Sequence, residues 1–451
     1  MEQKEPPRTV AVVGSGMAGL VTAYLLHHDP LRRYRVRLLE KRDQVSLSAE
    51  SLALPSPTGE AKRSWADVPM RAFAAGFYSN LIRLYDHLGV RYHEQPFLFS
   101  FSRLGPSSAR GSADPCMVHT SNFHQVPPAP RNRGLVPWLI EGIYVLACYL
   151  WFTVCCFFVP PLDTSPGETL DQYLRRIHLP RSYADNYLLP IISSVCTCNH
   201  HQLLRFPASD ILDYKKRTHR QDHYVVTDGV HAAQEQLLRG LDVRLGVHST
   251  RVSPTQSGVD ITTRNADGAE STKRFDHAVL AVSPDIVASI FAPLQAALTA
   301  IPTTTVDTVA HTDYSALAPM LRATATPQGA SVRTAASSQR IQFMSSGATT
   351  ESVHEQPNSV LVTTNPLSPV DRSKVIRSAT FTRVLRTPQS RALVNELFDE
   401  NGSEKPSSGW RNGDHGVYLA GGWCWDGMVL LEGCIVSAMR VAADLGVEIP
   451  W

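Results

Sequence analysis

The sequence lacks the features that mark nucleic-acid-binding and zinc-binding proteins. Its 43 basic and 41 acidic residues leave a formal net charge of +2. Both signs are spread along the chain without a dense basic stripe, so nucleic acid is not an expected partner. The eight cysteines include one adjacent pair, Cys155 and Cys156, and one Cys-x-Cys element, Cys196 and Cys198. Neither spacing is that of a zinc knuckle, and no metal site is predicted.

Residues 1–8 are charged where a secretory signal would need an apolar stretch. We therefore expect reduced thiols and a cytoplasmic protein. The 451 residues are 43% apolar and 19% charged, a balance typical of globular proteins, and the length favours two domains. Residues 106–133, rich in Pro, Ser and Arg, predict an exposed loop.

The clearest pattern is a glycine-rich turn between a predicted strand and a predicted helix. Residues 9–13 form an uncharged β-branched run, and Gly14-Ser15-Gly16-Met17-Ala18-Gly19 follows directly. Helical apolar spacing then continues to residue 28, and a second strand over 34–39 ends on Glu40. Strand, turn, helix, strand and acid occur in the order of a dinucleotide-binding unit.

Each part of this unit has a physical role. Gly14 permits a tight turn, Gly16 lets the backbone approach a pyrophosphate, and Gly19 allows the helix to pack closely on the strand. The N–H groups at the start of the helix face the phosphate charge. Glu40 can accept hydrogen bonds from ribose hydroxyls, which favours FAD or NAD over NADP.

The end of the chain selects between these two cofactors. Residues 416–420 predict a strand, and Gly421 and Gly422 leave room for a ribityl chain and a pyrophosphate. A helix expected from about Leu430 would direct the N–H groups of Leu430 and Leu431 at the flavin N1 and C2 carbonyl. Negative charge collects there on reduction, and a helix N-terminus stabilises it. The pattern favours FAD.

Residues 416–446 resemble the C-terminal flavin motif of the amine oxidase superfamily, which includes monoamine and polyamine oxidases, phytoene desaturases and protoporphyrinogen oxidase. Residues 224–252 and 275–282 are similar to two further segments of that superfamily. By this match, Gly229 starts a helix and Val252 contacts the cofactor through its backbone. Residues 68–90, 311–313 and 363–366 resemble a subgroup of NAD/FAD-binding amine-oxidase-like flavoproteins from fungi and bacteria. A polyunsaturated fatty acid isomerase is a more distant relative.

The resemblance covers nearly the whole chain and implies an α/β fold. It predicts a Rossmann-type, glutathione-reductase-like FAD-binding domain interleaved with an α+β substrate domain. Residues 1–60, 222–300 and 405–451 would form the FAD-binding domain. Residues 61–221 and 301–404 would form the substrate domain.

Two departures from the family pattern change the expected function. An Arg-x-Gly-Gly element that usually contacts the pyrophosphate is replaced by Gln44 and Ser46-Leu47. Arg42, with its neighbour Lys41, or Ser46 is expected to supply this contact. Amine oxidases carry an aromatic residue at the position of Leu430, where it forms one wall of a cage around the amine. An aliphatic wall suits an apolar substrate better.

Residues 142–159 contain no charged side chain and form the core of an apolar segment over 136–160. Three interpretations stay open: a buried helix lining the substrate domain, a monotopic helix that inserts into a membrane surface, and a single membrane span. The first two imply an apolar tunnel to the active site.

Flavin dehydrogenation often needs a base near the reacting carbon. His311 and Asp313 alternate along a predicted strand, and the resemblance places His311 beside the flavin. His311 is therefore the candidate acid or base, with a structural histidine as the alternative. The predicted function is an FAD-dependent oxidoreductase that transfers hydride from a small hydrophobic, lipid-like or secondary-metabolite substrate to flavin N5. A redox-neutral double-bond isomerase and a non-catalytic flavin-loaded binding protein are the alternatives.

Overall fold

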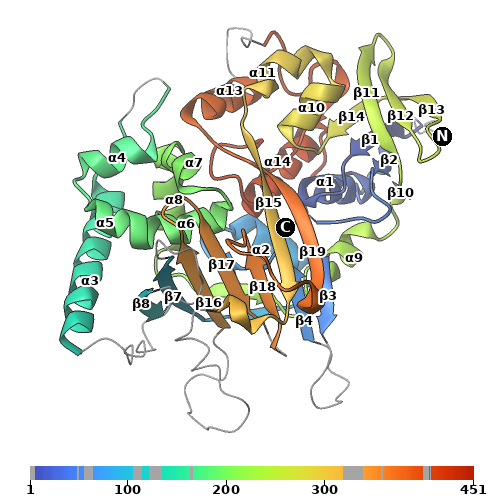
Figure 1. Ribbon diagram of the computed structural model, residues 1–451. Helices are drawn as coiled ribbons and strands as arrows, with labels where there is room; N and C mark the ends of the chain where they lie inside the picture. Colours follow the sequence, from blue (N-terminus) through green and yellow to red (C-terminus); the bar gives the residue numbers. More distant parts are fainter. Residues whose placement is uncertain are drawn as a thin grey trace.

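The computed structural model describes residues 6–47, 50–54, 64–104, 114–120, 135–162, 166–317, 339–356, 359–399, 406 and 408–451. Two sheets organise the chain (Figure 1). The first has five parallel strands in the order β10-β2-β1-β14-β20. Their bounds are Asp242–Arg244, Tyr34–Leu39, Arg8–Val13, His277–Leu280 and Val417–Leu419.

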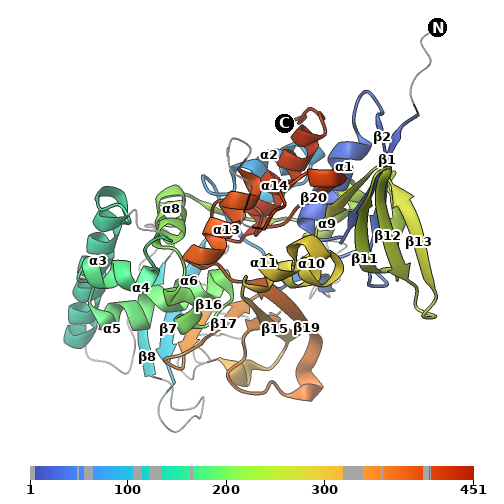
Figure 2. The same ribbon diagram turned by 90° about the horizontal axis from the view of Figure 1, so that it is seen from above.

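The central strand β1 is buried on both faces because its run of β-branched and small residues carries no charge. Val10 and Val12 point into one hydrophobic cluster, together with α1 (Met17–His27) and α14 (Leu431–Asp444). Ala11 and Val13 point into a second cluster on the other face. Helices α1 and α14 pack against one another (Figure 2).

The second face of the parallel sheet is covered by an antiparallel meander and short helices. These elements are β11 (His248–Thr255), β12 (Gly258–Arg264), β13 (Glu270–Phe275), α10 (Pro284–Ile290) and α11 (Gln295–Thr299).

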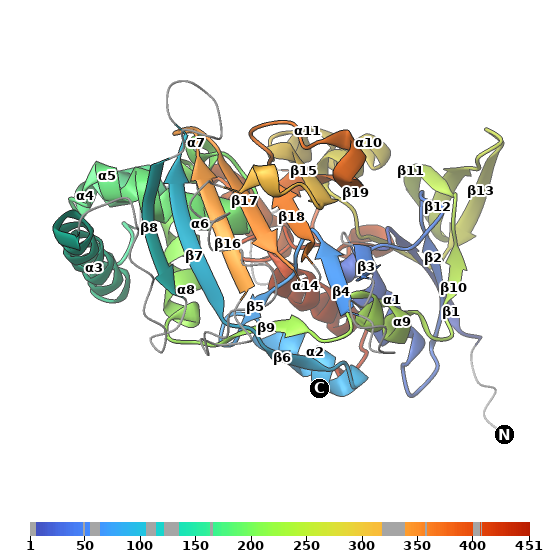
Figure 3. The ribbon, with the colours of Figure 1, turned by 60° about the horizontal axis from the view of Figure 1, so that its bottom comes forward.

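The second large sheet has seven strands in the order β19-β15-β18-β17-β16-β7-β8. Their bounds are Val375–Val384, Thr303–His311, Leu361–Thr364, Thr350–Glu355, Gln339–Ser345, Phe97–Arg103 and Asp114–Thr120. Neighbours are antiparallel except β16 and β7, which are parallel. Figure 3 shows β8, β7, β16, β17 and β18 side by side.

Helices from the middle of the chain lie beside this sheet, and α6 packs against β16 and β17. They are α3 (Leu135–Phe158), α4 (Leu170–Arg176), α5 (Arg181–Tyr183), a π-helical turn (Ala184–Leu188), α6 (Leu189–Cys196), α7 (His200–Leu204) and α8 (Ala208–Thr218). Helix α3 stands at the outer edge of the molecule and packs along α8 (Figures 1 and 2).

Smaller elements join the two sheets. They are β3 (Glu50–Leu54) with β4 (Ser64–Val68), the sheet of β5 (Phe73–Ala74), β9 (His223–Val226) and β6 (Tyr92–Glu94), and the helices α2 (Ser79–Leu88), α9 (His231–Leu238) and α13 (Pro388–Phe398).

The architecture confirms the predicted α/β fold with a Rossmann-like parallel sheet and a mixed second sheet. The predicted domain ranges stay a prediction, although all five parallel strands fall within 1–60, 222–300 and 405–451. The predicted boundary at residue 60 runs between β3 and β4, which pair with one another. Of the loop expected over 106–133, residues 114–120 form β8, and the remainder lies outside the described residues.

Candidate functional site

The turn between β1 and α1 requires glycine at two positions. Gly14 has φ +102°, and a Cβ on it would lie 2.6 Å from the Ala281 carbonyl oxygen. A Cβ on Gly19 would lie 2.0 Å from the Gly14 carbonyl oxygen. Gly16 is the N-cap of α1 and provides no side-chain cap. The first N–H groups of α1, beginning at Met17, are therefore available to an anion.

Glu40 lies beside this turn, at the end of β2. Its Oε2 accepts hydrogen bonds from the Ser15 backbone N–H at 2.9 Å and from Ser15 Oγ at 2.5 Å. The Arg42 N–H donates to Glu40 Oε1 at 2.9 Å. The side chains of Lys41 and Arg42 are exposed. Ser46 is buried and donates its N–H to Ser15 Oγ at 3.3 Å, so Ser46 reaches the turn directly.

Val252 lies at the same edge of the parallel sheet. It is buried in the cluster that contains Val13 and Leu39, the last residues of β1 and β2. The residue just before β11 is hydrogen-bonded to this edge: the Val247 N–H donates to the Glu40 carbonyl oxygen at 2.9 Å. The structure thus brings Val252 close to the ends of β1 and β2, and its contact with the cofactor stays a prediction.

The C-terminal turn folds back onto the start of α14. The Gly421 N–H donates to Ser437 Oγ at 2.9 Å. A Cβ on Gly422 would lie 3.0 Å from the Leu430 carbonyl oxygen. Leu430 is the N-cap of α14, again without a side-chain cap, and both Leu430 and Leu431 are partly exposed. Uncapped N–H groups at this helix start can stabilise negative charge.

The two ends of the chain meet at one thiol. Cys434, in the first turns of α14, lies beside Gly422, since a Cβ on Gly422 would be 3.3 Å from its Sγ, and the backbone of Gly422 and of Ala18 acts to lower the pKa of its thiol. Burial raises the pKa of Cys434 to about 11, so the thiol is neutral near pH 7. The N-terminal turn and the C-terminal turn therefore lie close to the same thiol. A dinucleotide whose phosphates contact both turns fits this arrangement.

Two arginines lie next to Cys434 and were not predicted from the sequence. Burial lowers the pKa of Arg71, with the Asp67 carboxylate acting in the opposite direction. Burial, followed by the like charge of Arg71, lowers the pKa of Arg383 to about 9, so its guanidinium stays protonated at neutral pH. Arg383 Nε donates to Thr197 Oγ1 at 3.1 Å.

Both arginines keep some accessible surface, although burial is the main influence on their pKa. Their influence on one another and on the Cys434 thiol puts two like charges near the C-terminal turn. Two like charges there favour an anionic group between them. One feature of the sequence pointed to a role for Arg71: it is the charged residue in the otherwise apolar run over residues 68–78.

The tryptophans near the C-terminal turn hold its shape. Trp423 Nε1 donates to the Val282 carbonyl oxygen at 3.1 Å, and Trp425 Nε1 donates to the Met428 carbonyl oxygen at 2.9 Å. Arg386 Nη2 donates to the Trp425 carbonyl oxygen at 2.8 Å. These contacts favour a packing role over stacking beside a flavin ring.

Glu432 holds α14 against α2. Its carboxylate accepts hydrogen bonds from the Asn80 N–H at 3.0 Å, Asn80 Nδ2 at 2.7 Å and the Leu81 N–H at 3.1 Å. Helix α2 has no side-chain cap of its own, so Glu432 acts as its N-terminal cap. This contact fixes the first turn of α14.

His311 is not brought together with these residues. It ends β15 and is fully buried, with Nε2 2.7 Å from Thr363 Oγ1 and Nδ1 accepting from the Asp313 N–H at 3.1 Å. Asp313 lies beyond the strand and caps a 3₁₀ turn, so the predicted alternation of the two residues in one strand is wrong.

His311 also lies far from the two arginines near the C-terminal turn. Thr304 of β15 pairs with Arg383, and seven further residues of strand lead to His311, about 23 Å along the sheet. The catalytic role of His311 stays a prediction, and its contacts are those of a structural histidine.

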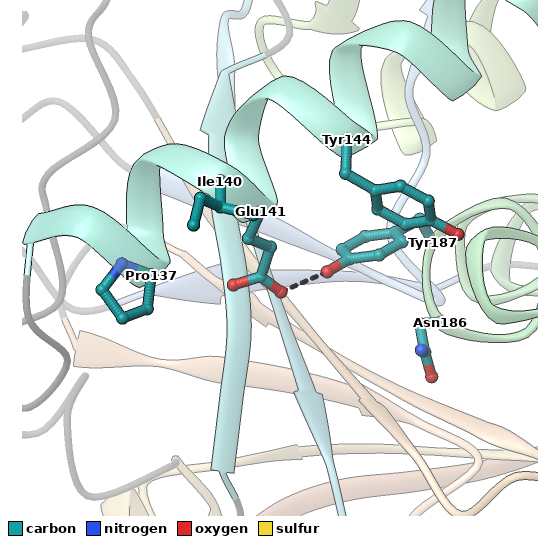
Figure 4. A pocket seen from close by; sticks show the side chains of 6 residues that line it. All are labelled: Pro137, Ile140, Glu141, Tyr144, Asn186 and Tyr187. Atoms are coloured by element: carbon teal, nitrogen blue, oxygen red, sulfur yellow. Dashed lines mark hydrogen bonds between the residues drawn. The ribbon is translucent and has the colours of Figure 1, made fainter.

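A groove on another part of the molecule is separate from these residues. It has a volume of about 460 Å³ between α3 and the π-helical turn, and its lining includes Ile140, Glu141, Tyr144 and Tyr187 (Figure 4). Glu141 and Tyr187 are hydrogen-bonded across it. None of the predicted cofactor residues lines this groove.

Comparisons with known proteins agree with this geometry. Residues 12–88 match the NAD(P)-binding Rossmann-like domain, and residues 158–353 match the flavin-containing amine oxidoreductase family. A search of curated protein sequences found no match.

Two solved structures have a similar fold. Cyclohexylamine oxidase from Brevibacterium oxydans has a TM-score of 0.57 and 12% identity, covering 98% of this chain and 100% of its own. A CLA-producing fatty acid isomerase from P. acnes has a TM-score of 0.60 and 12% identity, covering 98% and 99%. At this identity the likeness concerns the fold alone. The two family matches confirm the predicted resemblance to flavin-containing amine oxidoreductases, a family of enzymes, over residues 12–88 and 158–353.

Proposed function

We propose that the chain is an FAD-dependent oxidoreductase that dehydrogenates a small hydrophobic substrate, either lipid-like or a secondary metabolite. The turn at Gly14–Gly19, the carboxylate of Glu40 and the backbone of Val252 would hold the adenosine diphosphate part of FAD. Gly421, Gly422 and the start of α14 would hold the flavin part. When bound, the flavin supplies an acceptor for a hydride from a substrate carbon.

The side chain that carries this proposal is Leu430. It is the N-cap of α14, directly before the Leu431 N–H, and part of it remains accessible. An aliphatic side chain offers no π face to a cation, so it gives an ammonium group little stabilisation. It contributes instead to the desolvation of an apolar substrate.

Charged residues around the site support hydride acceptance. The guanidinium groups of Arg71 and Arg383 and the start of α14 all favour negative charge near the C-terminal turn. Such a site stabilises the reduced, anionic form of a flavin relative to the oxidised form. These residues act by position and charge and need no proton transfer.

Anaerobic mixing of the flavin-loaded protein with candidate substrates tests the proposal. Unsaturated acyl lipids and apolar alcohols form one set, and cyclohexylamine represents amines, because a cyclohexylamine oxidase shares the fold. We expect an apolar compound to bleach the long-wavelength flavin band and cyclohexylamine to leave it unchanged. Bleaching by the amine alone would contradict the proposal.

A variant adds a second test at Leu430. Leu430→Tyr, which introduces an aromatic wall, should slow reduction by the apolar substrate by about tenfold or more without lowering flavin content. Leu162→Tyr makes the same change at an exposed position and serves as control. Equal rates of flavin reduction in the two variants would show that Leu430 does not contact the substrate.

A redox-neutral double-bond isomerase is the second candidate. The aliphatic wall at Leu430 fits an unsaturated acyl chain equally well, and the hydride would return to the same substrate. The two reactions differ in oxygen consumption. An oxidase consumes oxygen during turnover, whereas an isomerase forms product without consuming oxygen.

A further inference from the structure

The outward face of α3 is apolar along the whole helix. Its large side chains at intervals of three and four residues are 47–79% exposed. They are Leu139, Ile143, Leu146, Leu150, Val154 and Phe158. The helix has 24 residues and is therefore about 36 Å long. A continuous apolar surface of this length on a protein marks an interaction site.

The polar groups of α3 point the other way. Glu141 is the only charged residue in the helix, and it hydrogen-bonds to the Tyr187 hydroxyl (Figure 4). The Tyr149 hydroxyl accepts a hydrogen bond from Lys215 Nζ at 3.0 Å. A helix on the surface of a protein in water has the opposite arrangement, with polar residues outside. The polarity of α3 is thus suited to an apolar environment outside the protein.

Basic residues flank one end of this face. Helix α8 packs along α3, and the rings of Phe157 and His219 lie 5.5 Å apart. Lys216, Arg217 and Arg220 follow at the exposed end of α8. Arg217 forms an ion pair with Asp213. Cationic side chains beside an apolar face match the headgroup region of an anionic bilayer.

We propose that the outward face of α3 docks onto an anionic lipid bilayer, with the helix lying in the plane of the membrane surface. The apolar side chains enter the acyl region, and Lys216 and Arg220 contact phosphate groups. This inference concerns where the enzyme works and does not depend on the proposed reaction.

The other two interpretations of this segment fit the contacts less well. α3 is long and apolar enough to cross a membrane, but its inner face is occupied. Cys148, Phe152, Cys155 and Cys156 are 0–6% exposed against the rest of the protein. A membrane span would have to give up these contacts, and a buried core helix would not leave its opposite face exposed.

Sedimentation of the full chain with lipid vesicles tests the proposal. We expect binding to vesicles that contain phosphatidylglycerol and weaker binding to phosphatidylcholine alone, with the difference lost at high salt. A triple variant with Ile143→Glu, Leu146→Glu and Leu150→Glu should lose binding to both. Leu31→Glu, Ile286→Glu and Ile376→Glu, three exposed apolar residues elsewhere, form the matched control and should bind normally.

A second variant and a spectroscopic probe keep the test independent of folding. Lys216→Gln with Arg220→Gln should weaken binding to the anionic vesicles roughly tenfold or more, with little effect on neutral ones. Trp151 is 48% exposed beside the docking face. Brominated lipids should quench its fluorescence, and Trp151→Phe should abolish that part of the quenching.

Three results would overturn the proposal. The first is equal vesicle binding by the triple variant and its control. The second is dimerisation in light scattering that the triple variant abolishes while vesicles bind neither protein, since α3 would then pair two copies of the chain. The third is resistance of the membrane-bound protein to alkaline extraction, which would indicate a span.

Discussion

Gly19 is the residue at which the N-terminal turn has least space. A Cβ there would lie 2.0 Å from the Gly14 carbonyl oxygen, which is backbone and cannot move aside cheaply. We expect Gly19→Ala to shift α1 away from β1 and to yield protein without flavin, measured by the ratio of visible to ultraviolet absorbance. Gly142→Ala is the control, because nothing lies within 4 Å of its added Cβ. Full flavin content in Gly19→Ala would place the cofactor elsewhere.

We expect Arg383 to affect the reduction potential of the flavin more than the stability of the fold. Removal of one of two neighbouring cations destabilises the reduced, anionic flavin, so Arg383→Met should lower the reduction potential. Photoreduction beside a reference dye measures the change. Arg377→Met makes the same change at an exposed position on the same strand and should leave the potential as it is. An unchanged potential in both variants would show that Arg383 does not face the flavin.

At the scale of elements, a buried ion cluster connects α8, α13 and the C-terminal turn. Asp210 of α8 is 2% exposed and lies 3.5 Å from Arg391 Nε and 4.0 Å from Arg386 Nε. Arg391 also pairs with Asp426 of the turn. Burial raises the pKa of Asp210 to about 6, although both arginines act in the opposite direction.

This raised pKa predicts a pH dependence of stability. The unfolded chain releases the Asp210 proton near pH 4, whereas the folded protein keeps it to about pH 6. The stabilising contribution of Asp210 is therefore complete below pH 4 and falls as pH rises to about 6. Asp210→Asn does not titrate, so its free energy of unfolding relative to wild type should rise by up to about 3 kcal/mol across that window.

Urea unfolding at several pH values measures this difference. Asp213→Asn, one turn further along α8, removes a half-exposed partner of Arg217 and should differ little from wild type at any of them. A pH-independent difference for Asp210→Asn would mean that the carboxylate stays ionised in the folded protein.

The elements of the cofactor site were predictable where local chemistry determines them. Strands β1 and β2 and helices α1 and α14 lie within a few residues of the predicted positions, since uncharged runs and glycine spacing define them. The start of α2 is determined differently, by distant parts of the chain. Phe73–Ala74 pair with β9, and Gly76 packs against the Arg217 carbonyl oxygen, so α2 begins only at Ser79. These contacts come from a distant part of the chain.

At the scale of the whole molecule, the unpredicted features are those that depend on the second sheet. Arg71 lies three residues after β4 and Arg383 is the last but one residue of β19, and both strands contact β15, so the two charges come together only through the folded sheet. His311 lies about 23 Å along β15 from the residue that pairs with Arg383, and its catalytic role stays a prediction. A single sequence shows that a strand is present but not which end lies over the cofactor.

The meeting of the two chain ends leads to a prediction about flavin removal. Helices α1 and α14 pack together, and the Cys434 thiol of α14 lies beside Gly422 and near the backbone of Ala18. If the flavin binds only when both ends are folded, it stabilises both by the same free energy. Removal of the flavin should therefore increase hydrogen exchange in residues 14–27 and 421–445 together. Hydrogen exchange in peptides from β16 and β17 should not change, because α6 and the neighbouring strands protect them whether or not the cofactor is bound. If only one end gained exchange, the two turns would not share one ligand, and the site would have to be assigned to that end alone.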